Sequence, residues 1–234
     1  MTNAEDPPES TQKVYNPAPP EYRNDARIKD YALSYANFEK DPDDFWRRVA
    51  SDLLWFRPWD KIKEWEYPHA KWFVNAKCNI TYNCLERHLK NNRRNKVALF
   101  WRGEDGTEKI YTYDRLYKAV MQFANALKNL GVGKGDVVCI YMPTVPEQVI
   151  AMLACARIGA VHTVVFAGYG GAAALNQRIV GSAAKIVITA DASMRRGGKS
   201  IPLKPIVEEA LIHAPSVERV VVLRLQDPPH LSSG

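Results

Sequence analysis

The sequence predicts an α/β fold with a mostly parallel sheet and flanking helices, preceded by an aromatic-rich N-terminal segment that wraps around it. All 13 glycines lie at or after Gly103, whereas all six tryptophans lie at or before Trp101. Beyond residue 96, short runs of Val and Ile alternate with segments of helical periodicity. This alternation is typical of β–α–β units, whose crossovers are right-handed.

Composition excludes several classes of protein. The 234 residues are 46% hydrophobic and 25% charged, which is normal for a globular chain. The net charge of +6 is spread out, and only 87–96 and 195–204 are locally basic, whereas a DNA-binding domain concentrates its charge. No apolar run could span a membrane, and the acidic N-terminus lacks the apolar core of a signal peptide. We therefore expect a cytoplasmic protein that binds neither nucleic acid nor membrane.

Three regions are expected along the chain. Residues 1–23 are polar and proline-rich and predict a disordered or extended tail. Residues 24–95 form an N-terminal cap segment, with a helix that begins at Asp41 and Pro42, an extended aromatic layer over 55–73 and a helix over 82–92. Residues 96–234 form the first part of a larger α/β domain.

In the α/β region, the sequence predicts a hairpin followed by alternating helices and strands. A hairpin of strands 97–101 and 110–113 turns at 104–106. Helices are expected over 116–130, 172–182 and 203–213, with a further helix opened by Pro143 and Pro146 and ending at Gly159. Strands are expected over 137–141, 161–166, 185–189 and 219–223. The glycine-rich stretch 131–136 lacks the spacing of a P-loop and predicts a helix end followed by a turn.

The four cysteines predict structural thiols. Five residues separate Cys78 from Cys84, too many for a usual zinc pair, and Cys139 and Cys155 lie within apolar runs. No histidine is spaced with another for metal binding, and no nucleophile motif or pair of acids is present. We therefore expect neither a metal site nor a catalytic residue within this chain.

A dinucleotide site is one reading of the glycines after strand 161–166. Gly168, Gly170 and Ala173 fit G-x-G-x-x-A, and Asp191 follows 23 residues after Gly168, about where a ribose-binding acid belongs. However, this fingerprint normally follows the first strand of its sheet, whereas here a hairpin and a further β–α unit precede it. A simple glycine-rich turn is the favoured alternative.

The second candidate site is a basic loop made of Arg195, Arg196, Gly197, Gly198 and Lys199. It follows the strand that ends near Asp191, and open α/β sheets bind ligands at the carboxyl ends of their strands. Glycines allow close approach of a ligand to the backbone, and Arg and Lys suit phosphate. No acid lies between Asp191 and Glu208. From the residues alone, the loop is either a phosphate site or a solvated basic turn.

Several runs are more specific than these patterns. Residues 56–62, 133–143, 145–147, 151–162, 188–191 and 200–204 closely resemble AMP-forming acetyl-CoA synthetases of the adenylate-forming superfamily, in order and in spacing. The ARIGAVH run at 156–162 and the IPLK run at 201–204 are typical of the branch that uses acetate and propionate. The resemblance covers nearly the whole chain after residue 24.

The resemblance implies a two-step reaction. Acetate and ATP with Mg²⁺ give acetyl-adenylate and pyrophosphate, and CoA then displaces AMP. The stretch before the IPLK run contacts the 3′-phosphorylated ADP end of CoA in this family, and here that stretch is the basic loop. One extra residue in the loop makes Arg195 and Arg196 alternatives for its first basic position.

The family also extends several hundred residues further than this chain. The ATP phosphate loop, the acyl pocket, the Mg²⁺ site and the mobile C-terminal domain lie outside it. We therefore expect the N-terminal part of an acetate–CoA ligase, inactive alone and with a complementary polypeptide as partner. The alternatives are part of a propionate–CoA ligase, a non-catalytic domain that binds CoA or a nucleotide or docks to another chain, and, distantly, an oxidoreductase.

Overall fold

The chain forms two compact units in a computed structural model that describes residues 19–167, 170–195 and 199–225. The first unit is Met1–Asp52 and the second is Leu53–Gly234. The division between them falls inside the segment 24–95. The domain boundary expected near residue 95 stays a prediction.

The described part of the first unit, residues 19–52, forms three helices, α1 (Pro20–Asp25), α2 (Tyr31–Lys40) and α3 (Pro42–Ala50). The Asp41 carboxylate accepts a hydrogen bond from the Asp44 amide at 2.9 Å and Pro42 is the first residue of α3, so the predicted helix start is confirmed. Asp30 caps α2 in the same way, through the Leu33 amide. Within these helices only Ala50 is buried.

The second unit is built around a four-stranded parallel sheet of order β10-β7-β5-β6, which confirms the predicted fold class. The strands are β5 (Val137–Met142), β6 (Val161–Phe166), β7 (Ile186–Ala190) and β10 (Arg219–Leu223). The chain runs from β5 outward to β6 and then crosses to β7 on the other side of β5. The strand order therefore reverses between β5 and β7, where open α/β sheets bind ligands.

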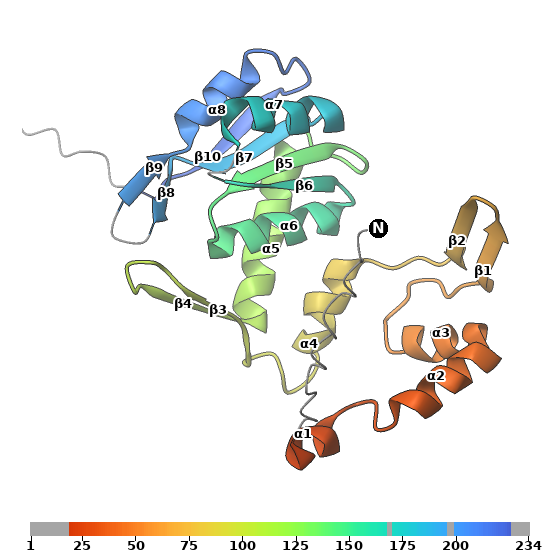
Figure 1. Cartoon of the computed structure of the whole chain (residues 1–234). Helices are drawn as coiled ribbons and strands as arrows, with labels where there is room; N and C mark the ends of the chain where they lie inside the picture. Colours follow the sequence, from red (N-terminus) through yellow and green to blue (C-terminus); the bar gives the residue numbers. More distant parts are fainter. Residues whose placement is uncertain (1–18, 168–169, 196–198, 226–234) are drawn as a thin grey trace, which may run out of the picture. The chain divides into compact units, whose positions relative to one another are not determined.

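Helices cover both faces of this sheet (Figure 1). Helices α5 (Tyr113–Asn129) and α6 (Pro146–Ile158) cover one face, and α7 (Gly171–Ser182) and α8 (Lys204–Leu211) cover the other. Alternate residues of β5 serve the two cores: Val138 and Ile140 pack with α5 and α6, whereas Cys139 and Tyr141 pack with α7. A strand buried on both faces is uniformly apolar, as this one is.

The glycine-rich stretch after α5 is a helix end and turn, as predicted. Gly131 has φ +87° and Gly135 has φ +90°, and the Val132 amide bonds back to the Leu127 carbonyl at 3.0 Å. The Asp136 carboxylate accepts hydrogen bonds from the Gly133 amide at 2.8 Å and from Lys185 Nζ at 3.1 Å. The stretch thus joins α5 to β5 and ties that turn to the start of β7.

The stretch expected as an extended aromatic layer folds as an antiparallel hairpin of β1 (Lys61–Glu66) and β2 (His69–Val74). Trp55, Trp59 and Phe73 form an aromatic cluster with ring centroids 5.3–5.4 Å apart. The helix expected over 82–92 is a π-helix, η1 (Tyr82–Glu86), followed by the short α4 (Arg87–Leu89).

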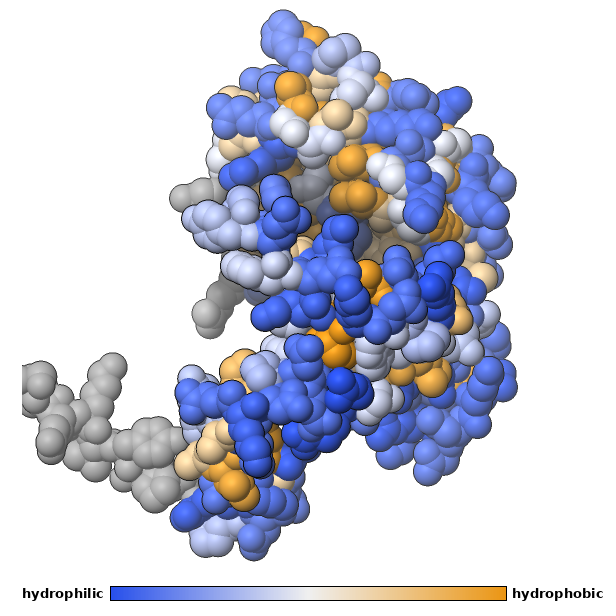
Figure 2. Space-filling model, turned by 90° about the vertical axis from the view of Figure 1, so that its right-hand side faces the viewer, coloured by the Kyte–Doolittle hydropathy of each residue, from blue (hydrophilic) through white to orange (hydrophobic). Residues whose placement is uncertain are grey.

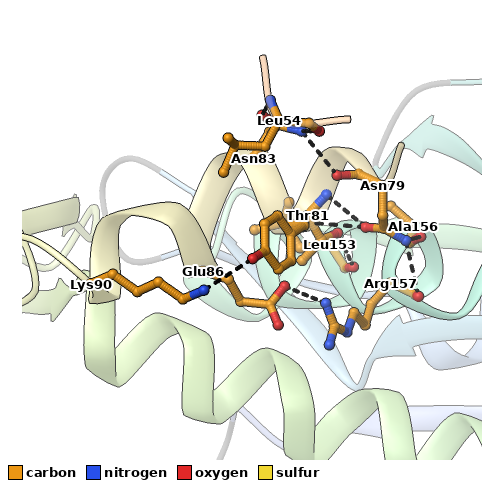
Figure 3. A network of polar contacts seen from close by, with 10 residues as sticks. Leu54, Asn79, Thr81, Asn83, Glu86, Lys90, Leu153, Ala156 and Arg157 are labelled. Atoms are coloured by element: carbon orange, nitrogen blue, oxygen red, sulfur yellow. Dashed lines mark hydrogen bonds and ion pairs between the residues drawn. The ribbon is translucent and has the colours of Figure 1, made fainter. Parts of the chain in front are cut away.

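A polar network fixes η1 to the end of α6 (Figure 3). Asn79 Nδ2 donates to the carbonyl of Ala156 and Thr81 Oγ1 donates to the carbonyl of Leu153, both at 3.0 Å. Glu86 pairs with Arg157 of α6. Asn79 Nδ2 also donates to the carbonyl of Arg157 at 3.1 Å, so Asn79 serves two of the carbonyls in the last turn of α6, which lack the usual partner inside the helix.

The surface carries both hydrophilic and hydrophobic residues. On the face drawn in Figure 2, hydrophobic groups lie among a hydrophilic majority. Among the described residues, none of the helices combines the length and apolar character needed to cross a bilayer.

Candidate functional site

A cavity of about 540 Å³ lies at the carboxyl ends of the parallel strands. Its lining comes from the loops that follow the strands and from a hairpin of β3 (Val97–Arg102) and β4 (Glu108–Thr112). The lining residues are Trp101, Arg102, Gly103, Glu104, Asp105, Thr107, Lys109, Pro143, Thr144, Val145, Phe166, Ala167, Ser193, Met194 and Leu225. The cavity therefore lies where the reversal of strand order predicts a ligand site.

The β3–β4 hairpin forms one wall of the cavity and is bonded to the start of α6. Trp101 Nε1 donates to the Thr144 carbonyl at 2.7 Å, and Lys109 Nζ donates to Glu147 Oε1 at 3.1 Å. The Lys109 ammonium also lies 5.6 Å from the centroid of the Trp101 ring, within cation–π range. Together these contacts hold the hairpin against the loop that follows β5.

Asp191 directly follows β7 and bonds to the backbone beside the lining residue Ser193 and to that of the lining residue Leu225. Its Oδ1 accepts hydrogen bonds from the amides of Ala192 at 2.8 Å and Leu225 at 2.9 Å. Its backbone N–H donates to the Leu223 carbonyl, and its carbonyl accepts from the Leu203 amide. One residue thus joins β7 to the start of α8 and to the end of β10.

This use of Asp191 weakens the dinucleotide reading. A ribose-binding acid must present its carboxylate to the ligand, whereas Asp191 Oδ1 already accepts from two backbone amides. Gly168 of that candidate motif lies outside the described residues. Gly170 has φ +82° and caps the N-terminus of α7, which is the role that the alternative glycine-rich turn requires.

The basic loop joins two short strands, β8 (Ala192–Arg195) and β9 (Lys199–Pro202), that pair in antiparallel register. Arg195 and Lys199 are register partners at the end of this ribbon where the chain passes from β8 to β9. Arg196, Gly197 and Gly198 lie outside the described residues. The structure therefore brings together the backbones of the first and last predicted site residues, one on β8, whose Ser193 and Met194 line the cavity, and the other on β9.

The hairpin wall was not predicted as part of a site. Val145 and Glu147 belong to a run that resembles a known family, but the contacts to Trp101 and Lys109 join residues 38 to 43 positions apart. The one hint in the sequence was Trp101, the last tryptophan, which lies just before the first glycine of the chain. Without the fold, nothing in the sequence pairs it with Thr144.

A parallel sheet with a cavity at the reversal of strand order defines an open α/β domain of the nucleotide-binding type. More particularly, the chain belongs to the AMP-binding enzyme family, whose family model matches residues 85–232. A second family model, the acetyl-coenzyme A synthetase N-terminus, matches residues 31–84.

Curated relatives are similar along most of the chain. An acetyl-coenzyme A synthetase of Chlorobaculum tepidum is 49% identical over 208 residues, which are 88% of this chain and 31% of the relative. One of Methanothrix thermoacetophila is 52% identical over 183 residues, 77% of this chain and 28% of the relative. A 3-hydroxypropionyl-coenzyme A synthetase of Sulfurisphaera tokodaii is 48% identical over 194 residues, 82% of this chain and 29% of the relative.

A solved structure agrees with the fold. The acetoacetyl-CoA synthetase from Streptomyces lividans matches with a TM-score of 0.78 at 27% identity, over 90% of this chain and 33% of that structure. The chain therefore spans about a third of the length of these relatives.

Proposed function

We propose that the chain is the N-terminal part of an acetate–CoA ligase, which converts acetate, ATP and CoA into acetyl-CoA, AMP and pyrophosphate. Identity of 49% and 52% to two proteins named acetyl-coenzyme A synthetase supports this activity. The structural observation that carries it is the β8–β9 ribbon, which bears the basic loop and also contributes Ser193 and Met194 to the cavity.

In this proposal the basic loop binds the 3′-phosphate of CoA. Arg195, the last residue of β8, and Lys199, the first residue of β9, are register partners. A basic residue therefore stands at each end of the connection between the two strands. No acid between Asp191 and Glu208 offsets that charge. Guanidinium and ammonium groups form charge-assisted hydrogen bonds with phosphate, and the two glycines permit close approach to the backbone.

The proposal assigns ATP, its Mg²⁺ and the chemical step to residues beyond this chain. The chain spans 31% of the Chlorobaculum relative. We therefore propose a complementary polypeptide, or a continuation of this one, as partner. The cytoplasmic location expected from the sequence stays a prediction.

Acetate-dependent exchange of pyrophosphate into ATP tests the fragment assignment. We expect no exchange with the 234-residue chain alone. We expect exchange when the chain is joined to the remainder of the Chlorobaculum relative. Exchange by the chain alone would contradict the assignment.

The loop is tested in the joined enzyme. Arg196→Ala should raise the CoA concentration needed for half-maximal rate by about tenfold, because one charge-assisted contact is lost. Pyrophosphate exchange should hardly change, since CoA takes no part in that half-reaction. With dephospho-CoA, which lacks the 3′-phosphate, wild type and variant should need the same concentration for half-maximal rate.

Arg195→Ala is the matched control, because the extra loop residue leaves two arginines for one position. A larger effect of Arg195→Ala would move the assignment by one residue. Equal loss of both half-reactions in Arg196→Ala would show that the loop is structural, and the CoA assignment would fail.

A three-carbon acid is the second candidate substrate. The relative named 3-hydroxypropionyl-coenzyme A synthetase, 48% identical, favours it. The proposed function places the pocket that binds the acid in the part of the enzyme beyond this chain. The test therefore requires the natural partner polypeptide, which would supply that pocket. The ratio of kcat/KM for acetate and propionate in that complex decides between them. The remaining alternative is a non-catalytic domain that binds CoA. It would be supported if the chain binds CoA but shows no pyrophosphate exchange with any partner.

A further inference from the structure

Positive charge gathers on one surface of the second unit, where two segments of the chain meet. Segment 87–96 follows η1, and segment 113–118 begins α5. Together they contain seven of the 32 basic residues and one of the 26 acidic residues. The rest of the chain, which includes the basic loop, therefore has 25 basic and 25 acidic residues. The two segments, here called the basic surface, thus account for the whole net charge of +6.

The fold places the two segments side by side (Figure 1). The loop that joins α4 to β3 lies against the first turn of α5. The Tyr113 amide donates to the carbonyl of Lys96 at 3.1 Å. The Asp114 amide donates to the carbonyl of Arg94, also at 3.1 Å. Cations of both segments therefore surround the N-terminus of α5, where the helix dipole adds partial positive charge.

The basic surface already binds one carboxylate, that of Asp114. Its Oδ1 accepts a hydrogen bond from the Arg94 guanidinium at 2.8 Å, and its Oδ2 lies 2.7 Å from Lys118 Nζ. The hydrogen bond from Lys118, and to a lesser degree that from Arg94, lowers the pKa of this carboxyl. One cation from each segment thus holds the same aspartate. The spacing of the two segments therefore suits a carboxylate.

Other cations of the basic surface are not compensated. Arg93, Lys96 and Arg115 are exposed, and among the described residues no acidic group pairs with their side chains. Glu86, which directly precedes the surface in the sequence, is paired with Arg157. Like charges on one surface repel one another, and they attract and steer an anionic partner. The basic surface is therefore suited to a partner that brings several negative charges.

Nucleic acid and membrane fit this surface less well than an acidic polypeptide. Two tyrosine rings beside the cations are covered: Tyr82 packs with Phe56 and with the Lys90 ammonium, and His88 lies against Tyr113. Neither ring is open for a base to stack on, as single-stranded nucleic acid requires. The two segments also have no exposed large hydrophobic side chain, which a membrane-surface site uses in addition to charge.

We propose that the basic surface binds an acidic segment of a partner protein, whose carboxylates pair with Arg93, Lys96 and Arg115 as Asp114 already pairs within the chain. Arginine suits this role because its planar guanidinium binds a carboxylate through two parallel hydrogen bonds. None of the residues in the two segments lines the cavity at the carboxyl ends of the strands. The interaction is therefore independent of the ligase function proposed above.

Fluorescence anisotropy with a labelled peptide of eight glutamates tests the proposal on the full 234-residue chain. A peptide of eight glutamines has the same length without the charge and serves as the control probe. We expect the glutamate peptide to bind and to lose at least tenfold in affinity between about 50 and 300 mM NaCl, because salt screens exposed ion pairs. The glutamine peptide should not bind. No binding of the glutamate peptide at the lower salt concentration would overturn the proposal.

Two matched double variants locate the binding surface. Arg93→Gln with Arg115→Gln removes one exposed cation from each segment. Lys128→Gln with Lys134→Gln removes two exposed cations at the other end of α5, about 25 Å away. The first pair should weaken binding of the glutamate peptide at least fivefold, and the second pair less than twofold. Equal losses would show that binding follows net charge and not this surface, and the proposal would fail.

Two further probes separate an acidic polypeptide from other anions. They are vesicles of equal parts phosphatidylglycerol and phosphatidylcholine, and a single strand of eight thymidines. We expect each to bind more weakly than the glutamate peptide, or to lose less than twofold in affinity in the variant that lacks Arg93 and Arg115. If either probe binds more tightly and loses at least fivefold in that variant, the surface recognises lipid or nucleic acid, and the proposal is overturned.

Discussion

Asp191 illustrates how a single residue can be misjudged from its position in the sequence. Its place after a strand and 23 residues beyond Gly168 suggests a ribose ligand. In the fold, its Oδ1 instead accepts from two backbone amides, one adjacent and one 34 residues away. A carboxylate that stabilises a sheet edge and one that binds a ribose have the same spacing. Only the long-range partner, Leu225, distinguishes them.

The four cysteines differ in reactivity for a physical reason. Cys139 and Cys155 are fully buried, and burial raises the pKa of each thiol to about 12, whereas Cys78 and Cys84 are exposed. The thiolate is the reactive form. We therefore predict that two thiols react rapidly with Ellman's reagent at pH 8 in the native chain and four in denaturant.

Peptide mapping after alkylation identifies the two reactive thiols. Cys78 and Cys84 should carry the label, with Cys84 the slower, because partial burial raises its pKa as well. Rapid labelling of Cys139 or Cys155 in the folded chain would contradict the buried environment described for β5 and α6.

At the scale of elements, three helices end in left-handed backbone, two of them at a glycine. Gly131 after α5 has φ +87° and Gly159 after α6 has φ +76°, whereas Ala183 after α7 has φ +51°. A residue with a Cβ is strained in that region, and glycine is not. Ala183 is exposed, so its methyl group contributes little packing.

We predict that Ala183→Gly raises the free energy of unfolding by up to about 1 kcal/mol, whereas Gly131→Ala lowers it by about 1–2 kcal/mol. Gly133→Ala is the control, because a Cβ there meets only Asp136 Oδ2 at an ordinary 3.8 Å. Urea denaturation measures all three variants. Destabilisation by Ala183→Gly would show that strain does not dominate at this helix end.

The turn between α5 and β5 should make stability depend on acid pH. The Gly133 amide, and next the Lys185 side chain, lower the pKa of the Asp136 carboxyl. A carboxylate with a lowered folded-state pKa stabilises the fold above its ordinary pKa, and that contribution is lost as the pH falls through the folded value. Asp136→Asn should therefore be less stable than wild type at pH 7 and should match it more closely in strong acid.

Lys185→Met separates the two causes. Because the Gly133 amide is the larger of them, the destabilisation caused by Asp136→Asn should shrink but persist in the Lys185→Met background. Urea midpoints between pH 7 and pH 2.5 provide the measurement. Parallel pH profiles for wild type and Asp136→Asn would refute the stabilising role of this carboxylate.

How much of the fold could be predicted follows from the range of the interactions involved. The ends of the parallel strands and of the helices that cover them were predicted to within three residues, because an apolar run and a helical period are local signals. β8 and β9 are four residues each, too short for a period to appear. The β1–β2 hairpin was missed because Lys, Glu and Trp share its strands and no clean alternation survives.

Only part of the candidate site could be predicted, because local sequence signals do not report contacts between distant residues. The basic loop is contiguous, so sequence alone could propose Arg195 and Lys199, and their place in a site stays a prediction. The wall of the cavity depends on Trp101 reaching Thr144 and on Lys109 reaching Glu147. Those contacts require the hairpin and the sheet to be already folded together.

At the scale of the whole molecule, the two units contribute unequally to stability. Both hydrophobic clusters, one on each face of the parallel sheet, draw their members from residues beyond Leu53. The helices of the first unit bury only Ala50 and expose Tyr31, Leu33 and Tyr35. Because buried apolar area is the main favourable contribution to folding, most of the stability should reside in the second unit.

Deletion of residues 1–52 tests this unequal division. We predict that the remaining chain, 53–234, keeps a cooperative thermal transition and shifts its midpoint by no more than a few degrees, because it retains every residue of both clusters. The isolated 1–52 peptide should show no cooperative transition, since its three described helices bury only Ala50. Circular dichroism melting of the two pieces and the parent chain provides the comparison. Loss of the transition in 53–234 would show that the three N-terminal helices supply stability beyond their own burial, and the sheet could then no longer be regarded as an independent folding unit.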